Sequence, residues 1–94
     1  MVEIVAQAFL DQWPEDLKKV RDAMKSADYK VVLYTSHALK GTLSIFGAVP
    51  ASELAMQIET LAGQSDGASM AALIDPFALE VERLLGVLQT QTLH

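Results

Sequence analysis

Apolar residues recur every three or four positions along almost the whole of this 94-residue chain. That spacing gathers side chains on one face of an α-helix, whereas a half-buried β-strand would alternate apolar and polar residues. The pattern is clearest in the last segment, where it comprises Met70, Leu73, Ile74, Phe77, Val81, Leu84, Leu85 and Leu88. No segment alternates as a strand would, so the sequence predicts an all-α protein.

Interruptions of this pattern divide the chain into helices. Pro14 interrupts the first apolar stripe, and proline is well tolerated at the first position of a helix. The sequence therefore predicts a short N-terminal helix before Pro14 and a second helix over residues 14–27. A third helix is expected over residues 29–48 and a fourth from Pro50, followed by a loop over residues 63–67.

The last apolar stripe contains a second internal proline, Pro76. The stripe keeps its phase across Pro76, so we expect one kinked helix there rather than a new helix that begins at Asp75-Pro76. Short connections favour antiparallel neighbours. The expected fold is an antiparallel up-down four-helix bundle with a short extra N-terminal helix. A chain of this length holds one hydrophobic core, so residues 1–94 are expected to form a single domain.

The composition argues against several classes of function. The formal net charge of −5 and the scattered lysine and arginine residues argue against nucleic-acid binding. The chain has no cysteine, which excludes disulfides, thiolate metal sites and cysteine nucleophiles. Residues 1–10 carry no positive charge, and no apolar run approaches the roughly 18 residues of a membrane span. We therefore expect a cytoplasmic protein without a signal peptide or direct membrane insertion.

His37 is the candidate functional residue of the third predicted helix. At about 100° of rotation per residue, His37 lies nearly opposite Leu39 and Phe46, which belong to the apolar face of this helix. Lys40 and Gly41 follow by three and four positions and therefore lie beside His37. The spacing predicts an exposed imidazole with a cation and a patch of bare backbone next to it.

These residue types suit a carrier of phosphoryl groups. A histidine side chain is partly neutral near pH 7 and can then act as a nucleophile. Lys40 is placed to neutralise phosphoryl oxygens, and Gly41 leaves room for the active site of a partner. Glycine inside a helix costs about 1 kcal/mol relative to alanine, so Gly41 and Gly47 invite a reason beyond folding. The alternative is an exposed histidine without function, beside a glycine that permits close helix packing.

A run of five residues carries a family resemblance. The sequence His37-Ala38-Leu39-Lys40-Gly41 resembles the H-x-L-K-G signature of histidine-containing phosphotransfer (HPt) domains of the bacterial phosphorelay type. The resemblance extends to Phe9-Leu10, Gly47-Ala48, Ala55 and Ile58-Glu59, and so covers nearly the whole chain. Two departures are mild: Ala51 stands where leucine is common, and Ser36 stands where alanine is common.

The resemblance implies a role for each residue of the signature. His37 would be phosphorylated, Lys40 would favour the phosphorylated state and Gly41 would give a partner access. Glu59 would lie on the adjacent helix near the histidine and could orient the imidazole, with an ordinary exposed glutamate as the alternative. Implied partners are response-regulator receiver domains and a sensor histidine kinase, with the phosphorylated aspartate and Mg²⁺ supplied by the receiver.

The residues around His37 suggest where a receiver would dock. We expect Leu33, Tyr34, Ala38, Ser44 and Ala48 to frame the contact. The alternative is that Leu33, Tyr34 and Ile45 complete the core against neighbouring helices.

The sequence predicts a carrier rather than an enzyme. It contains no G-x-x-x-x-G-K-[ST] loop or kinase-like motif, so we expect no ATP-dependent kinase activity, no cofactor and no metal site. We expect a monomer that forms the C-terminal module of a hybrid sensor histidine kinase, cytoplasmic even where that kinase is membrane-bound. A free-standing shuttle is the alternative within the family. Outside it, the alternatives are a helical interaction module with an idle histidine and a helical metalloprotein, which would need inward-projecting ligands.

Overall fold

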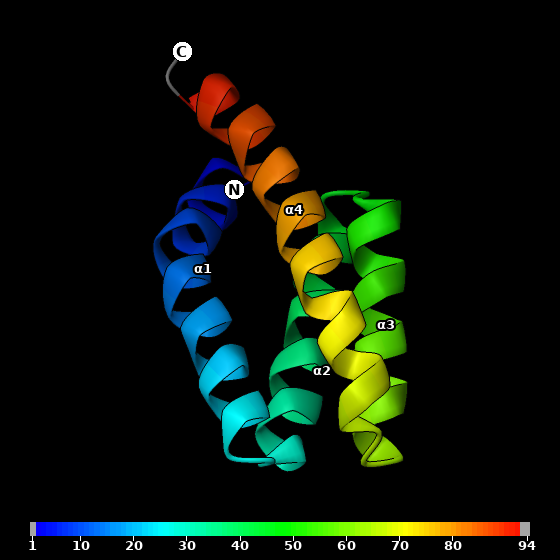
Figure 1. The fold of residues 1–94 in the computed structure, drawn as a ribbon. Coiled ribbons are helices and arrows are strands. Elements are labelled where there is room, and N and C mark those ends of the chain that lie inside the picture. The colour runs from blue at the N-terminus through cyan, green and yellow to red at the C-terminus, as the bar shows by residue number, and fades with distance from the viewer. Residues whose placement is uncertain (1, 93–94) are drawn as a thin grey trace.

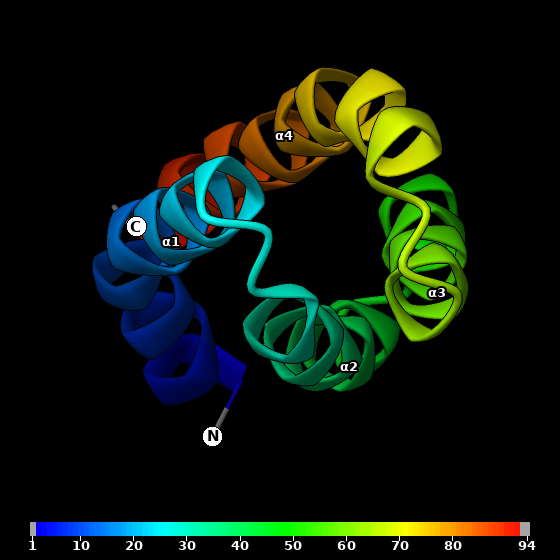
Figure 2. The same cartoon turned by 60° about the horizontal axis from the view of Figure 1, so that its bottom comes forward.

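Four α-helices make up the described part of the chain. The structure, a computed structural model, describes the backbone of residues 2–92 and the side chains of residues 4–90. Its helices are α1 (Val2–Lys25), α2 (Tyr29–Ile45), α3 (Val49–Gly63) and α4 (Gly67–Thr92). Consecutive helices run antiparallel (Figure 1), and the four close into a ring in chain order (Figure 2). The predicted up-down four-helix bundle is confirmed.

The expected short extra N-terminal helix is wrong, because α1 continues through Pro14 without a break. Ala6, Phe9, Trp13 and Val20 lie on one buried face of α1, so the apolar stripe keeps its phase across the proline. The ring of Pro14 itself is exposed. An internal proline costs about 3 kcal/mol. Burial of each large apolar side chain contributes about 1.5–3 kcal/mol, which is enough to keep the helix continuous.

Pro76 is likewise internal to one helix. α4 runs unbroken from Gly67 to Thr92, which confirms that a new helix does not begin at Asp75-Pro76. Phe77, next to the proline, is buried and meets Trp13 of α1 edge-on, with 5.8 Å between the ring centroids. Packing against α1 therefore holds the middle of α4 in place.

The three turns share one hydrogen-bonding pattern. In each, the amide at the last turn residue donates to a carbonyl five positions earlier: Asp28 to Ala23, Ala48 to Leu43 and Asp66 to Leu61. This is the Schellman arrangement, which ends a helix with one left-handed residue. The left-handed residue is Ala27 in the first turn, Gly47 in the second and Ser65 in the third, so only the second turn uses glycine. The loop expected over residues 63–67 is shorter, because Gly63 ends α3 and Gly67 begins α4.

The contact between α2 and α3 is the most extensive in the bundle. Leu39 of α2 is buried as expected, and Val32, Ser36 and Leu43 are buried with it. On α3 the buried face consists mainly of small side chains, Ala51, Ala55 and Ala62 around Ile58, whereas the larger Leu54 and Leu61 are only half-buried. Small side chains let two helices approach closely, and this brings polar residues of α3 within reach of α2.

Candidate functional site

His37 projects from α2 into solvent, as the helical periodicity predicted. Its side chain is 65% exposed, while its neighbours Ser36 and Leu39 are buried. Burial of these two neighbours sets the rotation of α2 about its axis, and this rotation turns His37 outward. The imidazole is therefore accessible to another protein.

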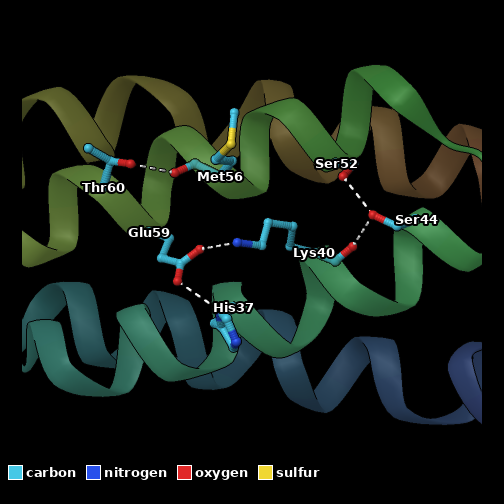
Figure 3. Close-up of polar contacts among 7 residues, drawn as sticks. All are labelled: His37, Lys40, Ser44, Ser52, Met56, Glu59 and Thr60. Atoms are coloured by element: carbon cyan, nitrogen blue, oxygen red, sulfur yellow. Dashed lines mark hydrogen bonds and ion pairs between the residues drawn. The ribbon is translucent and has the colours of Figure 1, made fainter.

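Glu59 of α3 joins His37 to Lys40 (Figure 3). One carboxylate oxygen, Oε2, lies 2.7 Å from Nδ1 of His37, and the other, Oε1, lies 2.9 Å from Nζ of Lys40. The side chains of Glu59 and Lys40 are only 22% and 31% exposed. Glu59 is thus not an ordinary exposed glutamate, and Lys40 lies beside His37 with its ammonium group already paired.

The contacts of Glu59 determine which ring nitrogen is free to react. The hydrogen bond from Lys40 holds the pKa of Glu59 below its ordinary value; burial opposes this shift, and the contact with His37 reinforces it. An ionised carboxylate can only accept hydrogen bonds, so Nδ1 of His37 must carry the hydrogen. In the neutral ring the lone pair then lies on Nε2, which is left as the nucleophilic nitrogen of an exposed side chain.

Gly41 leaves open surface beside the imidazole. A Cβ atom built at this position would have no neighbouring side chain or helix within 4 Å. The close-packing interpretation of Gly41 is therefore wrong, because no other helix approaches it in this structure. A glycine that costs helix stability and serves no internal packing is consistent with contact to a second molecule.

The predicted docking residues fall into two groups. Tyr34, Ala38 and Ser44 are exposed, whereas Leu33 and Ala48 are half-buried and pack against the core. The Ser44 hydroxyl donates to the Lys40 carbonyl at 2.9 Å and lies 3.2 Å from the Ser52 hydroxyl (Figure 3). Ile45, which the alternative assigned to the core, is 67% exposed.

A groove that the sequence did not reveal lies between α1 and α2, on the side of α2 that carries Ala38. It has a volume of about 230 Å³ and is lined by Val5, Ala8, Phe9, Gln12, Asp16, Ala38, Leu39 and Thr42. Ala38 is the only member of the predicted docking patch among them. The sequence signal for this groove is the apolar stripe before Pro14. Periodicity along that stripe does not show which helix packs beside it, so the sequence could not place the groove next to His37.

Two further expectations concern metals and membranes. Among the residues that the structure describes, no group of three histidine, cysteine, aspartate or glutamate side chains could hold a metal ion. His94, the second histidine of the chain, lies outside the described residues. Within the described ranges, no helix combines the length and the apolar character needed to cross a bilayer.

Comparison with known proteins agrees with this geometry. The sequence profile of the Hpt domain family matches residues 5–91. The fold is similar to that of histidine-containing phosphotransfer protein B (HptB) from Pseudomonas aeruginosa PAO1, with a TM-score of 0.89. The two chains are 21% identical over 96% of this chain and 78% of the other, a likeness that shows the fold alone. No curated protein matches the sequence significantly. The extent of the profile match shows that the chain belongs to the Hpt domain family, the histidine phosphotransfer carriers that interact with kinases and response regulators in two-component signalling and phosphorelays.

Proposed function

We propose that this chain accepts a phosphoryl group on Nε2 of His37 and exchanges it with aspartates of response-regulator receiver domains. One observation carries the proposal: Glu59 contacts Nδ1 of His37 at 2.7 Å, which leaves Nε2 as the free nitrogen of a side chain that is 65% exposed. Family membership indicates the class of reaction, and the contact with Glu59 indicates which atom reacts, Nε2.

The transfer follows from the chemistry of the two partners. The Nε2 lone pair attacks phosphorus in line, the phosphorus–oxygen bond of the aspartyl phosphate breaks, and its electrons return to the receiver carboxylate. Donation to a receiver is the reverse reaction. Lys40, three positions beyond His37 on α2, is the cation that we assign to the phosphoryl oxygens, and the receiver contributes Mg²⁺ and the aspartate. With no nucleotide-binding loop in its sequence, the chain acts as a carrier without kinase activity of its own.

We assign the docking surface to the exposed part of α2 and the groove beside it. Tyr34 and Ala38 are exposed near His37, and the bare backbone of Gly41 lies one turn beyond. The groove between α1 and α2 provides apolar surface next to Ala38. Leu33, Ser44 and Ala48 remain predicted members of the patch.

The cellular setting is part of the proposal. We favour a monomeric cytoplasmic module at the C-terminal end of a hybrid sensor histidine kinase, with a free-standing shuttle as the alternative. The full coding sequence separates the two, because only in the first do kinase and receiver domains precede this module.

A transfer assay tests the function. The protein is incubated with phosphorylated receiver domains or with the small phosphoryl donor phosphoramidate, and the modified residue is identified. We expect an acid-labile adduct on His37 and its loss in His37→Gln, with helicity by circular dichroism as the folding control. Undiminished labelling of His37→Gln would assign the phosphoryl group elsewhere. A wild-type protein that accepts phosphate from neither source would instead be an interaction module.

A further inference from the structure

The contact between Glu59 and Nδ1 of His37 persists by geometry when the ring is phosphorylated, because the phosphoryl group occupies the opposite nitrogen. Oε2 of Glu59 lies 2.7 Å from Nδ1, and the carboxylate is anchored by its second contact, 2.9 Å to Lys40. Glu59 belongs to α3, so it reaches the ring from a helix other than the one that carries His37. A carboxylate so placed attracts a proton on Nδ1.

That proton decides how readily the phosphoryl group leaves. A ring with phosphorus on Nε2 and hydrogen on Nδ1 is an imidazolium. When its nitrogen–phosphorus bond breaks, the electron pair returns to Nε2, the proton stays on Nδ1 and the leaving group is neutral imidazole. A ring that has lost this proton must instead depart as an imidazolate anion, which is a far poorer leaving group.

We propose that Glu59 retains the Nδ1 proton of phosphorylated His37 and thereby keeps the phosphoryl group transferable to a receiver. This inference rests on the proposed function and makes Glu59 a positioning residue for it. The phosphoryl group moves to a receiver aspartate as the nitrogen–phosphorus bond breaks and a phosphorus–oxygen bond forms. Because the proton stays on Nδ1, the ring returns directly to the state in which Nε2 can accept the next phosphoryl group.

Charged groups around the ring have opposite effects on protonation of the ring. From α3, Glu59 favours the protonated ring, and from α2, Lys40 opposes it. Among the described residues, further titratable groups near this side of α2 include Tyr34, one turn before His37, and Asp16 of α1, which lines the groove that contains Ala38. Glu59 is the charged group in contact with the ring, so substitution of Glu59 is the direct test.

The test measures ring protonation and phosphohistidine lifetime in the same protein. His37 is phosphorylated with phosphoramidate, ¹⁵N chemical shifts follow protonation of Nδ1 against pH, and ³¹P spectra follow hydrolysis. In Glu59→Gln we expect the protonation midpoint to fall by about 0.5–1 pH unit. The phosphohistidine should then persist about three- to tenfold longer at neutral pH, and transfer to a receiver should slow by a similar factor.

A matched control is Glu82→Gln, an exposed glutamate of α4, which should leave both midpoint and lifetime unchanged. Equal midpoints and lifetimes in Glu59→Gln and wild type would overturn the inference. These outcomes concern a protein that is phosphorylated on His37. Failure of the wild type to become phosphorylated there would refute the proposed function itself.

Discussion

Gly41 separates the requirements of folding from those of partner contact. A methyl group at this position meets no side chain or neighbouring helix of the bundle, and alanine is the better helix former by about 1 kcal/mol. Gly41→Ala should therefore raise the free energy of unfolding by up to about 1 kcal/mol and yet slow phosphoryl transfer from a receiver, because the methyl group obstructs docking.

Gly86 offers the matched control, because it lies in α4 and a methyl group there would also project into open space. Gly86→Ala should stabilise the fold to a similar extent and leave the transfer rate unchanged. Urea denaturation and single-turnover transfer measure the two effects. Equal transfer rates in Gly41→Ala and wild type would show that a receiver does not approach this residue closely.

The pair between Lys40 and Glu59 makes stability depend on pH. The pKa of Glu59 is lower in the folded protein than its ordinary value, so the pair stabilises the fold at neutral pH and loses this effect as the pH falls through the lowered value. Lys40→Met should cost up to about 1 kcal/mol at neutral pH, since the pair is partly solvated. That cost should shrink once acid protonates Glu59.

Denaturation by urea at neutral and at strongly acidic pH measures this difference. Lys30→Met is the control, because Lys30 is an exposed lysine of the same helix. A stability loss in Lys40→Met that stays constant across pH would mean that packing of the lysine stem, rather than its charge, is responsible.

At the scale of the element, α1 shows how packing overrides a local signal. Pro14 lacks the amide hydrogen that would bond to the Leu10 carbonyl, yet the helix continues and buries Phe9 and Trp13 on one face. Pro14→Ala should restore that hydrogen bond and stabilise the protein by about 1–3 kcal/mol. Thermal denaturation should show a higher midpoint, whereas a lower midpoint would indicate that α1 depends on the proline.

At the scale of the whole molecule, one close contact joins the beginnings of α2 and α4. A Cβ atom at Gly67 would overlap the hydroxyl of Tyr29, so these two helix starts pack without room for a side chain. Gly67→Ala should destabilise the bundle by about 1–3 kcal/mol, a typical cost of overpacking. Adding Tyr29→Phe should recover part of the loss. Gly63→Ala is the control, because its methyl group would make only an ordinary contact with Leu33, and chemical denaturation compares all three.

Local periodicity by itself determined much of this protein. The amphipathic stripes predicted the four-helix bundle, and one rotation of about 100° per residue predicted an exposed His37 beside Lys40. These predictions succeeded because neighbours three and four residues apart on a helix are the same in any tertiary environment.

Tertiary structure decided everything that depends on which helices meet. It kept α1 continuous through Pro14, because burial against α2 and α4 outweighs the missing hydrogen bond. It also formed the groove beside Ala38 and placed Glu59 against Nδ1 of His37, 22 positions away in sequence. Periodicity along one helix carries no information about its distance from another, so the atom left free to react became visible only in the assembled bundle.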